Sequence, residues 1–375
     1  MPPPLTVLIL TAGFGEGHNS AARSIAEALL QESKGECQAT VVDLFEDAAP
    51  ISGAFYKWCY RQMINHLPNL WAWLFELTKK GNFAAMWWDR FIGVRAAMAA
   101  RLHQHHPQVV VFTYPTYSYV LTSLKSDPAV PQPQRVFLAV TDSITIHPIW
   151  LHGAVDRVYV TDEFSQSIAQ QGLRCAADVE VSGFPVAPAF ASFPPRSPRP
   201  STHPLRVLYF ATTAKSHVRP TLRGLLQNLP PHASLTVIMG KHDKRLRSEV
   251  EQIAQEYPLA KITLIAWTRE VPQLLMAHDI VISKAGGATV HECFAAGVPV
   301  ITNYIIPGQE EGNAELLERL GCGCRCLVPS ETGLLLVAMM ADGRLDAMSQ
   351  AMAKHRRPNG ALRIAGAILD PASRD

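Results

Sequence analysis

A glycine-rich turn near the amino end leads directly into a histidine. Gly13, Gly15 and Gly17 alternate after an apolar run, and His18 follows at the entrance of a helix expected from about Asn19 to Gln31. This spacing differs from the G-x-G-x-x-G of dinucleotide-binding turns. A helix amino terminus disfavours the charged imidazolium, which favours His18 as a neutral general base. A capping or packing histidine is the alternative interpretation.

An aspartate stands where another expected strand, 136–140, ends. It belongs to the run Thr141-Asp142-Ser-Ile-Thr-Ile-His147-Pro148-Ile-Trp150. Catalytic side chains gather at the carboxyl ends of strands in α/β sheets. Three roles are open for Asp142: orienting His18, accepting a hydrogen bond from a substrate hydroxyl, or capping the following turn.

The densest group of candidate ligand-binding residues lies between 279 and 320. A β-branched run, 280–283, leads into Gly286-Gly287, and a helix is expected from Thr289 to Ala296. The two glycines let an anion approach the backbone. The helix start presents free N–H groups and a positive dipole end. This combination suits a diphosphate without requiring a metal ion.

Further polar side chains extend this site. Glu292 lies one turn into the helix, where its carboxylate can accept bonds from both hydroxyls of a ribose. Past a second strand, 300–302, a helix is expected from Gln309 to Leu320, with Glu310 and Asn313 on one face at its start. These groups suit sugar hydroxyls. The alternative is two packed strand-loop-helix units with ordinary polar loops.

These residues carry a family resemblance. The pattern Lys284-Ala285-Gly286-Gly287, Glu292, Gly297-x-Pro299 and Pro307-Gly308-Gln309-Glu310-x-x-Asn313 resembles the carboxyl half of the monogalactosyldiacylglycerol synthase and processive diacylglycerol glucosyltransferase family. Gly15-x-Gly17-His18-x-x-Ala21-Ala22 and the run from Thr141 to Trp150 resemble its amino half. The family is related to the glycosyltransferase that makes peptidoglycan lipid II and is similar to glycosyltransferase family 28. The resemblance implies the α/β fold called GT-B, with two Rossmann-like domains facing a cleft, and inverting transfer from a UDP-sugar.

The resemblance also implies a role for each matched residue. Glu292 and the Gly-Gly loop would hold uridine diphosphate, the end of the strand 262–267 would line the uracil, and His18 would lie near the acceptor hydroxyl. The expected donor-binding residues are Gly240, Lys241, Trp267, Thr268, Lys284, Gly286, Gly287, Thr289, Glu292, Gln309, Glu310 and Asn313. The expected catalytic residues are His18 and Asp142, and those on the acceptor side are Gly15, Gly17, His147 and Trp150.

One turn departs from the family pattern. The glycine-rich turn expected after the strand 205–210 is replaced by Ala211-Thr212-Thr213-Ala214-Lys215-Ser216. A backbone cradle for phosphate is harder to form there, which leaves hydroxyls and Lys215 as the candidates to substitute.

The elements that must position these residues fall into two domains. Short apolar runs alternate with helical segments throughout, which indicates parallel sheets. A proline-rich linker, 191–204, separates an amino-terminal acceptor-side domain, 1–190, from a UDP-sugar-binding domain, 205–375. The terminal helix, near 361–369, is expected to cross back to the first domain.

Residues 53–101 combine aromatic and basic side chains. Five of the seven tryptophans lie there, with seven basic residues against two acidic ones. Such a mixture suits the lipid–water interface above anionic headgroups, so we expect reversible docking on an anionic membrane surface. The alternative is an amphipathic helical pair that packs its aromatics inward.

The composition limits the function classes. A net charge of +2 argues against nucleic-acid binding by bulk charge, and the seven cysteines, without paired spacing, indicate free thiols. No run is long enough to span a bilayer, so we expect a cytoplasmic protein, peripheral on the cytosolic face of a membrane. Neither a D-x-D pair nor well-spaced His or Cys ligands occur, so we expect no metal and no cofactor.

These features agree with what the resemblance implies, a hexosyltransferase that moves galactose or glucose from a UDP-sugar to diacylglycerol or a similar glycerolipid. The charge of the leaving group would then be stabilised by helix amino termini and Lys284. A polyprenyl-linked or other apolar acceptor is the nearest alternative. A non-catalytic lipid- or nucleotide-binding protein on the same scaffold is the second, because the glycine turn after strand 205–210 is lost.

Overall fold

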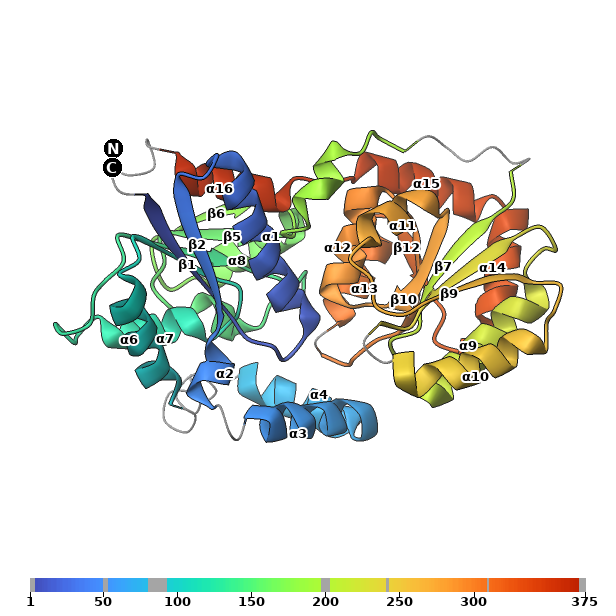
Figure 1. The fold of residues 1–375 in the computed structure, drawn as a ribbon, viewed down its shortest axis with the longest axis horizontal. Coiled ribbons are helices and arrows are strands. Elements are labelled where there is room, and N and C mark those ends of the chain that lie inside the picture. Colours follow the sequence, from blue (N-terminus) through green and yellow to red (C-terminus); the bar gives the residue numbers. More distant parts are fainter. Residues whose placement is uncertain are drawn as a thin grey trace. The chain divides into compact units, whose positions relative to one another are not determined.

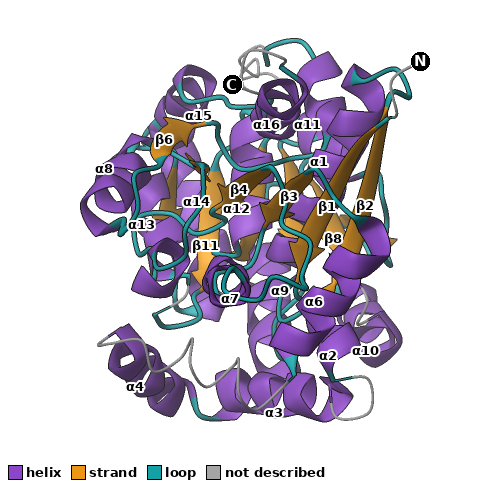
Figure 2. Ribbon diagram, turned by 90° about the vertical axis from the view of Figure 1, so that its left-hand side faces the viewer, coloured by secondary structure: helices purple, strands orange, loops and turns teal. Residues whose placement is uncertain are grey.

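The computed structural model describes residues 4–49, 53–79, 93–196, 203–240, 243–308 and 310–370. The chain forms two compact units. Unit 1 contains Met1–Pro188, Pro307–Gly312 and Asn359–Asp375, and unit 2 contains Ala189–Ile306 and Asn313–Pro358. Each unit is built on a parallel sheet of six strands that is flanked by helices (Figures 1 and 2).

The sheet of unit 1 has the order β2-β1-β3-β4-β5-β6. Its strands are β1 (Leu5–Thr11), β2 (Cys37–Asp43), β3 (Val109–Phe112), β4 (Arg135–Ala139), β5 (Arg157–Val160) and β6 (Asp178–Val181). The chain moves outward from β1 to β2 and then returns to place β3 on the other side of β1. Ligands of α/β folds bind at the carboxyl ends of strands beside such a reversal. This rule points to the loops after β1 and β3.

Helices cover both faces of this sheet because its strands are apolar on both faces. In β1, Val7 and Ile9 pack toward α1 (Glu16–Glu32) and α16 (Gly360–Leu369), whereas Leu8 and Leu10 pack in the core on the other face. The helix α16 lies beside α1, although the two come from opposite ends of the chain (Figure 1). The remaining helical segments are α2 (Leu44–Ala48), α3 (Gly53–His66), α4 (Pro68–Lys79), α6 (Val94–His105), α7 (Tyr117–Leu124), η1 (Pro148–Leu151) and α8 (Glu163–Gly172).

The sheet of unit 2 has the order β12-β11-β10-β7-β8-β9, which is the 3-2-1-4-5-6 arrangement of dinucleotide-binding folds. Its strands are β7 (Arg206–Phe210), β8 (Ser234–Ile238), β9 (Lys261–Ile265), β10 (Ile280–Lys284), β11 (Val300–Tyr304) and β12 (Gly323–Arg325). The reversal lies between β7 and β10. The helical segments are η2 (Pro188–Ser192), α9 (Lys215–Asn228), α10 (Asp243–Gln255), α11 (Val271–Ala277), α12 (Gly287–Ala296), α13 (Glu311–Arg319), η4 (Pro329–Glu331), α14 (Thr332–Ala341) and α15 (Arg344–Lys354).

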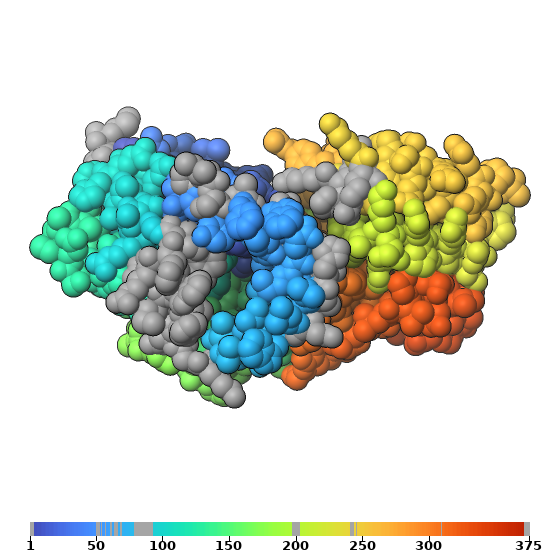
Figure 3. All heavy atoms as spheres, turned by 90° about the horizontal axis from the view of Figure 1, so that it is seen from below, coloured from blue at the N-terminus to red at the C-terminus, as the bar shows by residue number. Residues whose placement is uncertain are grey.

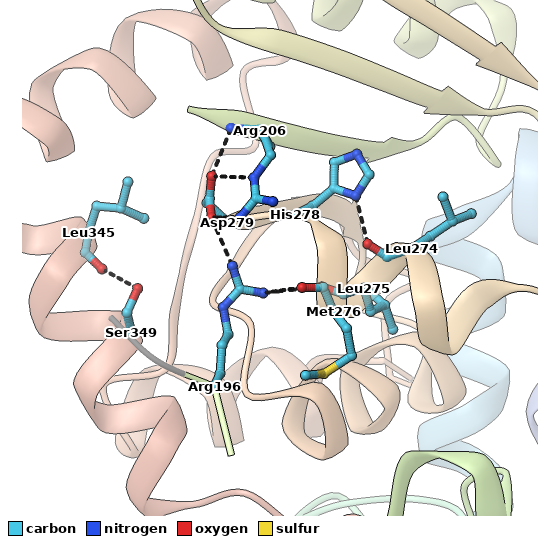
Figure 4. A network of polar contacts seen from close by, with 9 residues as sticks. All are labelled: Arg196, Arg206, Leu274, Leu275, Met276, His278, Asp279, Leu345 and Ser349. Atoms are coloured by element: carbon cyan, nitrogen blue, oxygen red, sulfur yellow. Dashed lines mark hydrogen bonds and ion pairs between the residues drawn. The ribbon is translucent and has the colours of Figure 1, made fainter. Parts of the chain in front are cut away.

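Ion pairs fix the chain as it enters unit 2. The carboxylate of Asp279 is buried, and it accepts bonds from Arg196 at 2.9 Å and from the guanidinium and backbone of Arg206 (Figure 4). Arg196 also donates to the carbonyl of Leu275. A buried carboxylate with several charge-assisted partners offsets its loss of hydration. The first part of the expected linker, up to Arg196, is therefore anchored in unit 2, and residues 197–202 lie outside the described ranges.

Several element boundaries differ from the sequence-based expectations. The first helix begins at Glu16 rather than Asn19, so His18 lies inside its first turn. The segment 41–45 is predicted as the second strand from its apolar residues, but the strand covers Cys37–Asp43, because its edge position tolerates polar residues that interrupt the apolar pattern. The helix expected from Gln309 begins at Glu311.

None of the helices within the described ranges has both the length and the apolar character needed to cross a bilayer. All seven cysteines are free thiols, as expected.

Candidate active site

The glycine turn after β1 is held by β2. The carboxylate of Asp43 accepts a 2.8 Å bond from the backbone N–H of Gly13, and its other oxygen accepts from Glu46 to cap α2. Gly15 is the residue before α1, and Gly17 and His18 are the second and third residues of the helix. The turn therefore delivers His18 to the carboxyl edge of the sheet, between β1 and β3.

Two protein groups fix the His18 ring through Nδ1. The carbonyl oxygen of Thr113 lies 2.8 Å away and the hydroxyl of Thr141 lies 2.9 Å away. Because a carbonyl can only accept, Nδ1 carries the proton, and Nε2 keeps the lone pair. This is the tautomer that a general base needs at Nε2.

Burial sets the charge state of His18. The side chain is 9% exposed, and burial lowers its pKa to about 4, although the bond to Thr113 acts in the opposite direction. Sequence reasoning assigned the neutral form to the helix amino terminus, whereas the structure assigns the larger effect to desolvation. The imidazole is neutral at pH 7.

Asp142 is engaged by an indole. Its Oδ2 accepts a 2.7 Å bond from Nε1 of Trp150, whose ring centroid lies 5.9 Å from that of His18. Burial raises the pKa of Asp142 to about 6, and the Trp150 bond opposes this rise. Within the described residues Asp142 makes no other hydrogen bond, so it neither caps a turn nor orients His18 directly. Acceptance from a substrate hydroxyl is the expected role that this geometry leaves open.

His147 ties the loop after β4 to α4. Its Nδ1 accepts from the backbone N–H of Ile149, so Nε2 carries the proton and donates to the hydroxyl of Thr78 at 3.2 Å. That hydroxyl in turn donates to the carbonyl of Phe75. His147, expected on the acceptor side, therefore bridges the loop after β4 and α4.

Sequence reasoning missed three threonines of this site. Thr113 and Thr141 hold His18, and Thr78 holds His147. The apolar run 109–113 predicts a strand that ends at Thr113, and Thr141 follows the expected strand 136–140. Both positions were a usable signal, because strand ends collect functional groups. Nothing in the local sequence singles out Thr78.

In unit 2 two hydrogen bonds of Ala285 hold the turn after β10. Ala285 receives a hydrogen bond from the Asn313 side-chain amide at 3.0 Å, and its own N–H donates to the carbonyl of Tyr304. Gly286 is the residue before α12, where no side chain caps the helix, and Gly287 and Thr289 are its first and third residues. The N–H groups of this first turn therefore face the carboxyl edge without a side-chain cap. This arrangement suits an anion.

Glu292 retains unused hydrogen-bonding capacity. Among the described residues its carboxylate has no hydrogen-bond partner, and burial raises its pKa to about 7. The Oδ1 atom of Asn313 is also buried without a partner. Both groups can accept hydrogen bonds from a bound molecule.

The structure describes some, but not all, of the other residues expected on the donor side. Gly240 lies two residues after the end of β8 and has φ +60°, a conformation that favours glycine. Trp267 is 54% exposed, with the Arg269 guanidinium over its ring, and the hydroxyl of Thr268 accepts from the backbone of Glu270. Lys284 closes β10. Lys241 and Gln309 lie outside the described residues.

The expectation that Glu310 and Asn313 share a helical face is wrong. Glu310 is buried but precedes α13, and it belongs to the segment Pro307–Gly312 of unit 1. Asn313 is the third residue of α13 and belongs to unit 2. The loop before the helix has its own conformation, so helical spacing does not apply across it.

The turn that departs from the family pattern does not offer a free lysine. Lys215 is the first residue of α9 and lies 3.3 Å from the carboxylate of Glu249, which also pairs with Arg219. Lys215 and Arg219 thus share one carboxylate, which is 8% exposed. In the described parts of the chain, no three His, Cys, Asp or Glu side chains converge at metal-binding distance.

Comparison with known proteins places the two halves in known families. Residues 18–186 match the monogalactosyldiacylglycerol (MGDG) synthase family, and residues 220–366 match the C-terminal domain of glycosyltransferase family 28. The chloroplastic monogalactosyldiacylglycerol synthase of Spinacia oleracea is 26% identical over 96% of this chain and 71% of its own length. A processive diacylglycerol beta-glucosyltransferase of Bacillus cytotoxicus is 28% identical over 97% of this chain and 93% of its own length.

Solved structures identify the fold. The crystal structure of MurG from Acinetobacter baumannii aligns with a TM-score of 0.58 and 16% identity, covering 97% of this chain and 99% of its own. With the strand orders described above, this likeness identifies the GT-B fold.

Proposed function

Since the chain belongs to the monogalactosyldiacylglycerol synthase family of glycosyltransferases, we propose that it transfers a hexose from a UDP-sugar to the free hydroxyl of diacylglycerol or a similar glycerolipid. The observation that carries this proposal is the His18 ring, which is neutral, fixed at Nδ1 by Thr113 and unprotonated at Nε2. A group of this kind is needed to deprotonate an alcohol near neutral pH.

The proposed step is a single displacement. The acceptor oxygen attacks the anomeric carbon from the face opposite the diphosphate, its proton passes to Nε2 of His18, and UDP leaves with the electrons of the broken bond. Burial also makes His18 a weak base in its resting state. The proton is therefore transferred as the new C–O bond forms, when the hydroxyl becomes more acidic. Asp142 is placed to accept a bond from another acceptor or sugar hydroxyl.

The donor is proposed to bind unit 2 at the reversal between β7 and β10. The first turn of α12 would receive the diphosphate, and the carboxylate of Glu292 would accept bonds from the ribose hydroxyls. The developing charge on UDP would be stabilised by these N–H groups and by Lys284. Because Lys215 is paired with Glu249, we do not assign it to the diphosphate.

The test is a transfer assay with both donors, because the two relatives named above carry different sugars in their names. UDP release is measured from UDP-glucose and from UDP-galactose, with and without dioleoylglycerol, and the lipid product is identified. The proposal expects release that depends on the lipid and yields a glycosyldiacylglycerol. If UDP is released only when a polyprenyl phosphate is present, the acceptor is a polyprenyl-linked lipid and not a glycerolipid. Binding of UDP without any transfer would make the chain a non-catalytic binding protein.

We further propose that α3 and α4 dock on the membrane that contains the acceptor. These helices lie on the face seen in Figure 3. They and the residue between them, Leu67, expose large apolar side chains, and those of the helices are Phe55, Tyr56, Trp58, Leu70, Trp73 and Leu77. Large exposed apolar side chains grouped on one surface indicate an interaction site. Within the described part of the segment, Trp71 and Phe75 are less exposed, so the aromatics divide between an outer and an inner set. Lys80 and Arg90, which contribute to the basic character of the segment, lie outside the described residues.

A further inference from the structure

The loop between Asp142 and His147 contains a strained turn. The N–H of Thr145 bonds to the carbonyl of Ser143, which closes a three-residue turn around Ile144. Ile144 has φ +54°, a value that is unfavourable for a β-branched residue. Turns of this form with a positive φ at the centre are rare and strained.

Two other non-glycine residues share a positive φ, but their positions explain it. Lys34 and His106 follow the ends of α1 and α6, where a left-handed residue commonly terminates a helix. Ile144 lies at no helix end. Strain at such a position persists only where the surrounding structure imposes it.

A buried hydrogen-bond network holds Ile144 in this strained conformation. The backbone N–H of Ile144 donates to Oγ of Ser165 at 3.0 Å, and that hydroxyl donates to the carboxylate of Asp162 at 2.7 Å. The hydroxyl of Ser143 lies 2.9 Å from that of Thr161, which also donates to Asp162 at 2.7 Å. Asp162 can only accept, so both chains of donors run from the turn to one carboxylate.

The four side chains of this network, Ser143, Thr161, Asp162 and Ser165, are at most 2% exposed. Asp162 also caps α8 by accepting from the backbone of Ser165 at 2.9 Å. The strained turn is thus fixed to the amino end of a helix. Asp142, an expected catalytic residue, directly precedes the turn, and His147, expected on the acceptor side, follows it by two residues. A charge-assisted network of this kind holds its members more rigidly than neutral bonds would.

We propose that Ser165 and Asp162 are positioning residues for sugar transfer, which hold Ile144 in its strained conformation so that Asp142 and His147 meet the acceptor. This inference rests on the proposed function for its activity readout. The alternative is that the network only caps α8 and stabilises unit 1.

Two substitutions separate these possibilities. Ser165→Ala removes the acceptor of the Ile144 N–H but keeps the backbone cap from Asp162. Ile144→Gly removes the cost of a positive φ, because glycine adopts that conformation without strain. The matched control is Ser167→Ala on the same helix, where the exposed hydroxyl donates to the carbonyl of Glu163 at 3.2 Å.

We expect S165A to lower kcat up to about 100-fold, the cost of a small misplacement of reacting groups, while the Kd for UDP in unit 2 stays unchanged. S167A should match the parent. In the I144G background the same S165A change should cost much less, because the turn then forms without being held. Equal fold-losses from S165A in both backgrounds would overturn the proposal, as would an effect of S167A equal to that of S165A.

Hydrogen exchange at the Ile144 amide provides a readout that does not depend on lipid transfer. The amide should be protected in the parent and exchange faster in S165A. An unchanged exchange rate would overturn the proposal even if no transfer activity were found. Absence of transfer in the parent protein, with the exchange difference intact, would instead count against the proposed function alone.

Discussion

The two candidate sites differ in how far the protein satisfies their polar groups. In unit 1, Nδ1 of His18, Oδ2 of Asp142 and both ring nitrogens of His147 are engaged by protein atoms. In unit 2, the carboxylate of Glu292 and Oδ1 of Asn313 have no protein partner among the described residues. A buried group left unpaired costs free energy until a ligand supplies the missing bonds.

This difference separates groups that the protein must hold in one orientation from groups that must be available to bind a ligand. A proton acceptor works only if its tautomer and orientation are fixed before the substrate arrives, so its second nitrogen is occupied by the protein. A ligand-binding carboxylate is more useful with its lone pairs available. Substitutions should therefore affect turnover in unit 1 and affinity in unit 2.

The largest expected effect is on turnover. His18→Ala should lower kcat by about 10²–10⁴-fold, the usual contribution of a general base, and leave the Kd for UDP unchanged. Single-turnover kinetics with saturating donor measure the loss of turnover, and calorimetry measures the Kd for UDP. Near-normal turnover in this variant would reduce His18 to a structural role and remove the contrast between the units.

The next effect is on affinity. Glu292→Ala should weaken UDP binding by about 1.5–3 kcal/mol, roughly 10- to 100-fold, the value of hydrogen bonds to a charged group. Turnover at saturating donor should change much less. Calorimetry that gives the same Kd for the variant and the parent would place the nucleotide elsewhere.

The pH dependence of binding sharpens the assignment to Glu292. Its raised pKa of about 7 means that the carboxylate is mostly protonated at pH 6 and mostly ionised at pH 8. In the proposed site the ionised form would accept from both ribose hydroxyls, so the affinity for UDP should fall as the pH falls through 7, by about tenfold between pH 8 and pH 6. Titration of the UDP phosphate contributes to the same range, and Glu292→Gln is the control that isolates it. If the variant shows the same pH dependence as the parent, Glu292 does not titrate in the site.

The smallest expected effect concerns the surface of α4. Trp73 is 59% exposed, whereas Trp71, two residues away, contacts the ring of Tyr60 at 5.2 Å. Trp73→Ala should weaken sedimentation with anionic vesicles by about fivefold, from the partial loss of apolar burial, and salt should weaken it further. Trp71→Ala, checked for folding by circular dichroism, should leave vesicle binding unchanged. Equal losses in the two variants would mean that the exposed face does not dock.

The sequence by itself determined the fold class and the identity of the chemical groups. Apolar runs at strand length, such as 109–113 and 280–283, specify buried parallel strands, because both faces of such strands must be covered. The Gly-Gly turn before α12 and the glycine turn before His18 were readable for the same local reason. Clustered glycines before a helical segment mark a turn in the sequence itself, whatever the rest of the chain does.

Tertiary structure alone decided which state each group adopts. The helix terminus was visible in the sequence. The burial that lowers the pKa of His18, and the contacts of its ring with Thr113 and Thr141, exist only once segments far apart along the chain pack together. The partners of Asp142 and Ile144, and the pairing of Lys215 with Glu249, likewise depend on which strand ends and helices lie together. Local spacing fixes what a residue can do, whereas desolvation and hydrogen bonding, which fix what it does, require the folded neighbours.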